Sequence, residues 1–555
     1  MGFVRRIIRA ASSPIRALRW RRGDSGSDRP ASLSGAAIAY AGVARTVFAP
    51  WWRKLIRWSV VITGLVLFAG MQYGMAVLIN RWWWWFIIAF FVIAGSIALA
   101  SFRPILVFVA WLVISPFGRH FLYMDFGWLA FPALTFDLIA IYFLAVVLVF
   151  RALANRKPVG KLLFAEWLML LFVVYVAATQ AVSPENKTFM DIVRTTSRTL
   201  IPEVLILSVL YFVTKGVIQK KEHAALILKS MILFGLLMAV VAFYEHYTGN
   251  RWYSLVVGFG IPLAWQGIAE GRASGMFDHA AAPAALIATT FLLSYHLAGW
   301  TRAAHVRAMY YGIMVLMIVG AFFTYTRNVY VVLMLTVLLM PFAASVKRGR
   351  FVALSVLGFV LLVVIAPFLL RDQDLYNRVT DLKNAEARVV YARTTINVIR
   401  HNLWFGVGWG NVNKAHKEYV TSLRHHNYKP DSRRLGWVNI SHNSYLTVMA
   451  EQGLVGSVLY FGAIAAFMGR LLRIRKRIPA EGLVGRDLVS IVIVSSVGFL
   501  TSIVAASIYL IPYVNWIFWM QFALVVRLDE LNRQESEERA EVPARQMAAI
   551  PAAAG

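Results

Sequence analysis

Three segments far apart in the sequence carry basic residues that suit chemistry on an anionic substrate. Arg272 stands just before an apolar segment whose start is marked by Pro283, and Arg327 lies in a short turn between two apolar segments. His442 directly precedes the apolar segment 443–468. A guanidinium group binds phosphate oxygens bidentately, and a histidine, with an ordinary pKa of about 6.5, can take a proton from a hydroxyl group. A snorkelling or ion-paired arginine is the alternative interpretation of the first two residues.

The segment that begins at His442 places polar residues at the entrance of an apolar helix. Asn443 is a good N-cap, so His442 is expected beside the positive end of the helix dipole, where water and anions reach it. Glu451 lies about 12 Å deeper at 1.5 Å per residue, and Gly453 and Gly456 would let a neighbouring helix come close. A carboxylate at that depth is a candidate for function, with a buried structural hydrogen bond as the alternative.

The composition identifies a polytopic membrane protein. Of 555 residues, 59% are hydrophobic and only 15% are charged, and the mean hydropathy is +0.63, which no soluble domain needs. The net charge is +29, but lysine and arginine lie mainly between apolar runs, where they set membrane topology, and this distribution argues against nucleic-acid binding. The chain has no cysteine, which excludes disulfides, thiol nucleophiles and thiolate metal sites.

Apolar segments near the length of about 20 residues that a bilayer requires follow one another along the chain. The fourteen segments lie at 58–79, 82–102, 104–116, 131–150, 162–182, 200–219, 224–244, 280–299, 306–323, 328–346, 351–370, 443–468, 487–509 and 511–527. The third segment is short and the last two are hard to separate. The sequence therefore predicts an all-α integral membrane protein with twelve to fourteen transmembrane helices.

These segments divide the chain into five parts. Residues 1–57 form a basic tail expected on the cytoplasmic side, since no apolar core follows its first arginines soon enough for a signal peptide. Residues 58–370 hold transmembrane helices with short loops, and residues 371–442 form one large extracytoplasmic loop. Residues 443–527 hold the C-terminal transmembrane helices, and residues 528–555 form a cytoplasmic tail expected to be disordered or a loose helix.

The distribution of lysine and arginine supports this topology. With the N-terminus in the cytoplasm and fourteen spans, every inside loop is basic. The same alternation places four segments on the extracytoplasmic face: 183–199, 245–279, 324–328 and 371–442. The two arginines and the histidine then lie at the outer ends of helices, where three basic groups suit a lipid diphosphate.

The large loop combines basic and aromatic side chains, which suit sugar stacking and the binding of anionic glycans or phosphate, with packing and interface anchoring as the alternative explanation of the aromatic residues. Residues 387–400 are expected to form an amphipathic helix. The glycine run 406–410 looks like a phosphate loop but follows no strand, so we predict a turn. Glu203 and Glu245, at helix ends, are further candidates.

Four motifs follow one another between residues 270 and 460. They are Arg272-Ala273-Ser274-Gly275, then Thr326-Arg327-Asn328, then Ala387-Arg388 followed by Asn402-Leu403-Trp404-Phe405-Gly406-Val407-Gly408, and finally His442-Asn443-Ser444-Tyr445-Leu446 with Glu451-Gln452-Gly453. In this order they resemble the O-antigen ligase and O-antigen polymerase superfamily, of which the last motif is the most specific part. The chain departs from the superfamily in the second motif, where Ser-Arg-Gly is commoner.

The resemblance implies a GT-C-type multispan glycosyltransferase that acts on the periplasmic face of the bacterial inner membrane. Members move a glycan from undecaprenyl diphosphate to lipid A core, to another lipid-linked glycan or to a protein hydroxyl. Carried onto this chain, Arg272 and Arg327 hold the donor diphosphate, and His442 positions or deprotonates the acceptor hydroxyl. Supporting roles fall to Asn443, Glu451 and Arg388. The resemblance implies no metal, nucleotide or other cofactor at this step.

The sequence thus favours a metal-independent, inverting glycosyltransferase of the ligase type. Its expected partners are an undecaprenyl diphosphate-linked glycan, lipid A core or another glycan acceptor, and membrane lipids, without nucleic acid. A polymerase of lipid-linked repeat units is the alternative, because it shares the motifs. A transporter of lipid-linked sugars is a more remote alternative, since the polar groups gather at one face and the chain shows no repeat. A third class of function, besides transferase and transporter, is a non-catalytic scaffold in an envelope complex.

Overall fold

The computed structural model describes the chain between residues 102 and 548, with gaps. The described residues are 102–121, 123–124, 134–154, 161–182, 188–249, 273, 281–344, 348–369, 383–419, 442–504 and 512–548. They all belong to the second of two compact units, Met1–Val77 and Leu78–Gly555. The basic tail predicted at residues 1–57 therefore lies outside the described residues.

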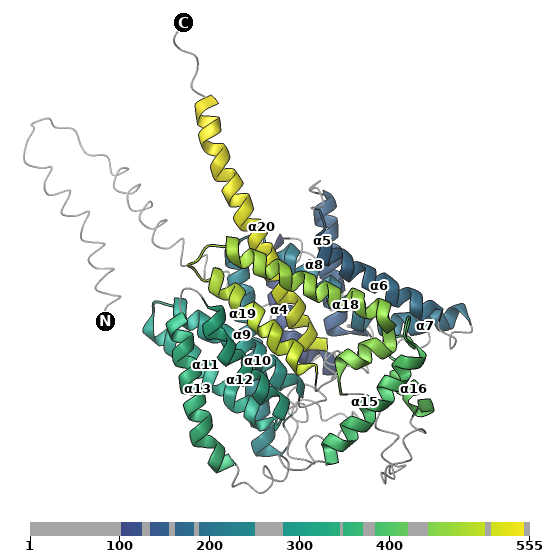
Figure 1. Ribbon diagram of the computed structural model, residues 1–555. Helices are drawn as coiled ribbons and strands as arrows, with labels where there is room; N and C mark the ends of the chain where they lie inside the picture. Colours follow the sequence, from purple (N-terminus) through teal and green to yellow (C-terminus); the bar gives the residue numbers. More distant parts are fainter. Residues whose placement is uncertain are drawn as a thin grey trace, which may run out of the picture. The chain divides into compact units, whose positions relative to one another are not determined.

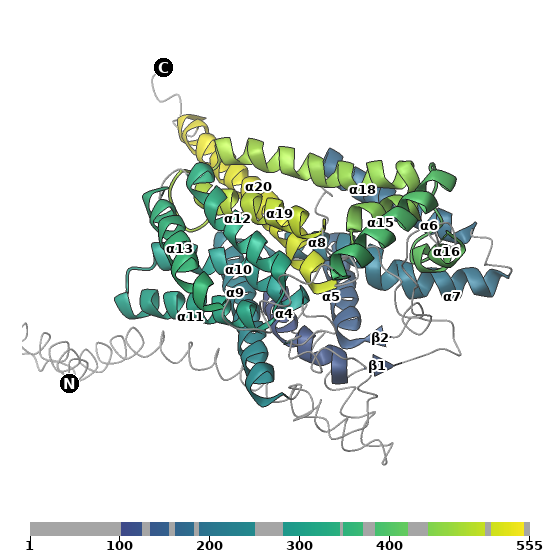
Figure 2. The ribbon, with the colours of Figure 1, turned by 60° about the horizontal axis from the view of Figure 1, so that its bottom comes forward.

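The described part of the chain is built from helices (Figure 1), with one minimal pair of strands (Figure 2). The helices are α4 (Pro104–Phe121), α5 (Phe136–Ala154), α6 (Phe164–Ala181), α7 (Phe189–Thr199), the π-helix η2 (Leu200–Leu205), α8 (Ile206–Val217), α9 (Lys221–Thr248), α10 (Ala281–Trp300), α11 (Ala304–Phe323), α12 (Arg327–Ala343), α13 (Arg348–Leu369), α15 (Lys383–His401), α16 (Val412–Tyr419), α18 (Ser444–Arg477), α19 (Arg486–Ser502) and α20 (Pro512–Ala548). Strands β1 (Tyr123–Met124) and β2 (Leu134–Thr135) pair antiparallel.

Several described helices have the length and apolar composition that a membrane span requires. Five candidate spans occur among the described residues: Phe164–Ala181, Leu200–Val217, Lys221–Thr248, Ala304–Phe323 and Ser444–Arg477. Shorter apolar helices are Pro104–Ser115, Leu138–Ala154 and Asn328–Ala343. The predicted class, an all-α multi-pass membrane protein, is confirmed. The total of twelve to fourteen spans counts segments outside the described residues and stays a prediction.

Small residues let neighbouring helices approach closely. A Cβ added to Gly320 of α11 would lie 2.5 Å from the Cα of Ala239 in α9. One added to Gly498 of α19 would lie 2.6 Å from the Cγ2 of Thr336 in α12. Because lipid tails are as apolar as leucine, close packing of this kind is a main source of attraction between membrane helices.

Helix α20 is enclosed by other helices, among them α18 and α19 (Figure 2). Every residue from 513 to 526 is buried. The ring of Phe522 stacks on that of Phe467 from α18, with 5.3 Å between the ring centroids. A helix that is apolar on all sides is stable only when it is surrounded, as it is here.

The same helix continues past its apolar part to Ala548. Acidic residues of this extension form ion pairs with basic residues of three other helices: Asp529 with Arg470 of α18 at 2.7 Å, Glu530 with Lys215 of α8 at 2.7 Å, and Glu535 with Lys221 of α9 at 2.8 Å. The tail is helical from residue 528 up to Ala548. These ion pairs hold its first turns against the other helices.

We expect Glu166→Ala to lower the melting temperature of the detergent-solubilised protein. Glu166 of α6 is fully buried and accepts hydrogen bonds at 2.8 Å from Lys215 Nζ and Tyr211 Oη, both of α8. Its removal leaves the Tyr211 hydroxyl without this acceptor and Lys215 with Glu530 alone, at a cost of about 1–3 kcal/mol. Glu222→Ala, at an exposed position of α9, is the control. Equal shifts in the two variants would argue against a packing role for Glu166.

Candidate active site

His442 lies at the N-terminus of α18 in a strained backbone conformation. Asn443 is the N-cap, as its position in the sequence predicts, and its side chain accepts a hydrogen bond from Leu446 N at 3.1 Å. His442 has a φ of 49°, a left-handed conformation that non-glycine residues rarely adopt. Strain of this kind concentrates at functional sites, where the surrounding structure enforces it.

The C-terminal end of α19 joins the starts of α12 and α18. Ser444 N donates to Ile503 O at 2.9 Å, and Asn328 Nδ2 donates to Ser502 O at 2.7 Å. Arg327 is the first residue of α12, and its side chain lies outside the described part of the structure. The two successive carbonyl groups therefore bring together the helix starts that carry Arg327 and His442.

The starts of α12 and α18 also share a backbone feature. Among the described residues, the non-glycine positions with positive φ are Tyr325, at 46°, and His442, at 49°. Each stands two residues before the first residue of its helix, Arg327 or Ser444. Both helices therefore begin at a sharp, strained turn, and both turns lie at the same end of α19.

Arg272 lies outside the described residues, but its neighbour in the chain does not. Ala273 is buried, and its N–H donates to Phe323 O at 3.2 Å, at the end of α11. Ala273 and Phe323 form an apolar cluster with Ala242 of α9. Glu245 is buried one turn further along α9. Ala273 therefore contacts the C-terminal end of α11, and the turn after α11 leads to Arg327.

Helix α15 brings an aromatic and a basic residue towards His442. The ring centroid of Tyr391 lies 6.4 Å from that of His442, with 48° between the ring planes. Arg388 is exposed and precedes Tyr391 by three residues, so the two share one face of α15. The predicted supporting residue Arg388 is thus one helical turn from a residue that contacts His442.

Helix α18 breaks at Gly453, where φ is 61° and ψ is −167°. The N–H groups of Leu454 and Val455 donate to the carbonyls of Leu403 and Trp404, at 2.7 and 3.3 Å. The carbonyls of Ala450 and Glu451, which those two N–H groups would meet in an unbroken helix, accept instead from Val407 and Gly408, at 3.0 and 2.8 Å. The segment 403–408, between α15 and α16, thus replaces the hydrogen bonds that the break removes. Figure 2 shows α15 lying along the first part of α18.

Glu451 takes part in this arrangement with its side chain. It is 1% exposed, and its Oε1 accepts a hydrogen bond from Val412 N, the first residue of α16, at 3.4 Å. A carboxylate at a helix N-terminus is favoured by the helix dipole. Glu451 therefore forms a buried hydrogen bond to the start of α16, as the structural alternative for this residue predicts.

The glycine run 406–410 forms the predicted turn. Gly406, Gly408 and Gly410 have positive φ values of 70°, 87° and 79°. A Cβ on Gly406 would lie 2.3 Å from the carbonyl carbon and oxygen of Glu451. Glycine is therefore required for both the turn and its close approach to α18.

Trp409 fixes the same turn to helices from the first half of the chain. Its indole Nε1 donates to Glu203 Oε2 at 2.5 Å, and its carbonyl accepts from Gln180 Nε2 at 2.6 Å. Glu203 lies in η2, and short π-helical segments of this kind are frequent at functional sites. Glu203 is a candidate from the sequence alone. Its contact with Trp409, and that of Trp409 with Gln180, could not be predicted, because no local pattern links residues more than 200 positions apart.

His416 is a buried titratable residue of α16. Burial lowers the pKa of its imidazole to about 4. Its Nε2 lies 2.9 Å from the Thr395 hydroxyl, which itself donates to Tyr391 O at 2.8 Å. Nε2 of the neutral ring therefore donates to Thr395. In the described part of the chain, no group of three or more histidine or acidic side chains comes together as a metal site would require.

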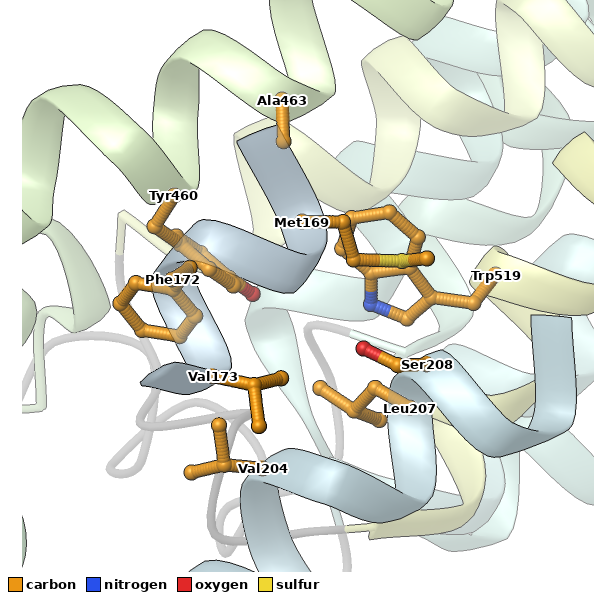
Figure 3. A pocket seen from close by; sticks show the side chains of 9 residues that line it. All are labelled: Met169, Phe172, Val173, Val204, Leu207, Ser208, Tyr460, Ala463 and Trp519. Carbon is orange, nitrogen blue, oxygen red and sulfur yellow. The ribbon is translucent and has the colours of Figure 1, made fainter. Parts of the chain in front are cut away.

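A small apolar cavity opens between α6, α8, α18 and α20, with Phe172, Tyr460 and Trp519 among its lining residues (Figure 3). The hydroxyl of Ser208 and the indole nitrogen of Trp519 point toward each other across it. Tyr460 follows His442 by eighteen residues along α18. The cavity is too small and too apolar for a sugar and is not the candidate site.

We expect Gly453→Ala to loosen the segment between α15 and α16. A Cβ at Gly453 would lie 2.3 Å from Trp404 O, and alanine does not favour a φ of 61°. The melting temperature should fall, and limited proteolysis near residues 403–411 should accelerate. Gly469→Ala is the matched control in the same helix, because nothing lies within 4 Å of its added Cβ. The same behaviour in both variants would contradict the helix break.

We expect the stability of the α15–α16 region to fall as the pH drops from about 6.5 to about 4. In that range His416 is protonated in the unfolded chain and neutral in the folded chain. Acid therefore favours unfolding by up to about 3 kcal/mol. Melting temperatures measured between pH 4 and 7.5 test this. His416→Gln should flatten the acid-side slope, whereas His305→Gln, at an exposed position, should keep it. An unchanged slope in His416→Gln would refute the assignment.

The comparison with protein families covers a part of this arrangement. Residues 312–461 match the family model described as O-antigen ligase. The matched residues include Arg327, Arg388 and His442, whereas Arg272 precedes them. No curated protein matches the chain. This stretch, somewhat more than a quarter of the chain, is therefore similar to O-antigen ligases, as the resemblance to the O-antigen ligase and polymerase superfamily predicts.

Proposed function

We propose that the chain is a glycosyltransferase of the O-antigen ligase type. It would move a glycan from undecaprenyl diphosphate to an acceptor hydroxyl on the periplasmic face of the bacterial inner membrane. The main support is the meeting of the N-termini of α12 and α18, where Asn328 and Ser444 bind successive carbonyls of α19. Helix N-termini carry partial positive charge, which attracts phosphate.

Two arginines are proposed to hold the donor diphosphate. Arg327 begins one of the two converging helices. Arg272 directly precedes Ala273, whose N–H donates to the carbonyl of Phe323 at the end of α11. In the chain, α11 is followed by the start of α12. A guanidinium group pairs with two phosphate oxygens at once and neutralises the charge that develops on a departing diphosphate. Two such groups would make undecaprenyl diphosphate a better leaving group.

His442 is proposed as the base. A nitrogen of its ring would accept the proton of the acceptor hydroxyl while the hydroxyl oxygen forms a bond to the anomeric carbon of the sugar. The bond between that carbon and the diphosphate oxygen breaks, and the electron pair leaves with undecaprenyl diphosphate. Attack from the face opposite the leaving group inverts the anomeric carbon. The energy comes from the sugar diphosphate bond, so this step needs no nucleotide. The two arginines are proposed to neutralise the diphosphate in place of a metal.

Three residues are proposed to support this chemistry without taking part in bond exchange. Asn443 caps α18 and thereby fixes the backbone next to His442. Glu451 binds the start of α16. Arg388 lies on the face of α15 that presents Tyr391 to His442, where it can meet an anionic group of the acceptor or donor.

Ligation and polymerisation would use the same site and differ in the acceptor. The matched family is described as a ligase, which favours ligation, with lipid A core as the proposed acceptor. A second lipid-linked glycan in the same position would make the protein a polymerase. Both products can be distinguished in one assay, because ligation gives a single conjugate and polymerisation gives a ladder.

We expect Arg272→Ala and Arg327→Ala each to abolish transfer without reducing the amount of folded protein. Each substitution removes one contact to the donor diphosphate. The assay combines purified protein with undecaprenyl diphosphate-linked glycan, alone and with lipid A core, without nucleotide and with a chelator present, and separates the products on a gel. Arg302→Ala, at an exposed position before α11, is the matched control. Full activity in both arginine variants would refute the diphosphate site.

A further inference from the structure

Three apolar side chains between α15 and α16 are exposed in succession. Leu403, Trp404 and Phe405 are 41%, 61% and 64% exposed. Water would be a poor solvent for so much contiguous apolar surface. What surrounds this apolar turn, which we define as residues 403–405, follows from the helices on which it lies.

The apolar turn is held against two candidate membrane spans. Its carbonyls accept from Leu454 N and Val455 N of α18, at 2.7 and 3.3 Å. The Phe405 carbonyl accepts from the hydroxyl of Tyr175 in α6 at 3.3 Å. The turn therefore lies alongside α6 and α18, the two helices that pack on each other in this region.

Tyr175 indicates how deep the turn lies. Helix α6 has 18 residues, about 27 Å at 1.5 Å per residue, close to the thickness of a hydrocarbon core. Tyr175 precedes the last helical residue, Ala181, by six positions, so its Cα lies about 9 Å inside that end. Helical side chains lean towards the N-terminus, which moves the tyrosine hydroxyl further inside. The turn that this hydroxyl binds is thus beside the apolar body of α6 and not beyond its end.

The exposed surfaces of the two helices next to the turn are also apolar. Leu171 and Val174 of α6 are 48% and 64% exposed, and Val455 and Val458 of α18 are 36% and 61% exposed. In a membrane protein such surfaces face lipid. Val455 donates its N–H to Trp404, so the apolar turn continues the lipid-facing surface of α18.

The carbonyl groups of the turn also have partners within the protein. Non-helical backbone is tolerated in hydrocarbon only where other protein groups satisfy it. The carbonyls of Leu403 and Trp404 accept hydrogen bonds from α18. The Phe405 carbonyl, at 3.3 Å, shares the hydroxyl proton of Tyr175 with the carbonyl of Gln452, at 2.7 Å. The turn can therefore enter the bilayer without leaving these three acceptors unpaired.

We propose that residues 403–405 form a wedge inserted into the bilayer, surrounded by the acyl chains of membrane lipids. The segment between α15 and α16 is then not wholly a water-exposed loop. It returns into the membrane, fills the break of α18 and anchors α15 at the membrane surface. This inference does not depend on glycosyl transfer.

The absence of native cysteine allows a direct measurement of depth. Single-cysteine variants Trp404→Cys and Phe405→Cys of the full chain are spin-labelled and reconstituted in phosphatidylcholine and phosphatidylglycerol liposomes without lipid-linked glycan. Power saturation measures collisions of each label with oxygen, which concentrates in the bilayer, and with a water-soluble nickel complex. We expect high oxygen and low nickel accessibility at both positions.

Two reference positions calibrate the measurement. Val174→Cys reports the lipid-facing surface of α6, and Lys414→Cys reports the exposed surface of α16. The wedge predicts that positions 404 and 405 resemble position 174, with nickel accessibility several-fold below that of position 414. Nickel accessibility equal to that of position 414 would overturn the proposal and leave a water-soluble partner as the occupant of the surface.

The wild-type chain supplies a second measurement that needs no substitution at the turn. A phospholipid with a photoactivatable diazirine in its acyl chain is crosslinked in the same liposomes, and labelled peptides are identified by mass spectrometry. Labelling of the peptide that contains residues 403–405, together with peptides of α6, supports insertion. Labelling of α6 without that peptide would refute it, even if the cysteine variants fail to fold.

Discussion

A helix inside a membrane cannot lose backbone hydrogen bonds without replacing them, because no water is present to satisfy the exposed groups. The break of α18 at Gly453 meets this constraint by exchanging partners with residues 403–408. These bonds attach the chain directly after α15 to α18. Glu451 attaches the start of α16 to the same helix. The helix break thus determines where α15 and α16 lie.

The position of α15 in turn determines what faces His442. Tyr391 reaches His442 from α15, and the contacts of Trp409 with Glu203 and Gln180 secure the following turn from the other side. The end of α19 holds the starts of α12 and α18 together through Ser502 and Ile503. Residues from distant regions of the chain therefore converge, which explains why strained turns are tolerated before both helices.

The sequence predicted the features that local patterns determine. Hydropathy gave the all-α membrane class, the N-cap role of Asn443 followed from its position before an apolar segment, and the glycine run 406–410 was recognised as a turn. The order of motifs predicted the similarity to the O-antigen ligase and polymerase superfamily. Long-range partners were not predictable: Glu451 binds Val412, Trp409 binds Glu203, and the acidic residues after position 528 bind three other helices. Such contacts depend on how helices pack and leave no periodic signal in the sequence.

The central claim is that His442 removes the proton of the acceptor hydroxyl. The most direct test is the single-turnover rate of glycan transfer by His442→Ala with the lipid-linked donor already bound. We predict that the rate falls by about 10²–10⁴-fold, while the affinity for a fluorescent donor and the melting temperature stay at wild-type values. A variant that transfers glycan at the wild-type rate would contradict the account.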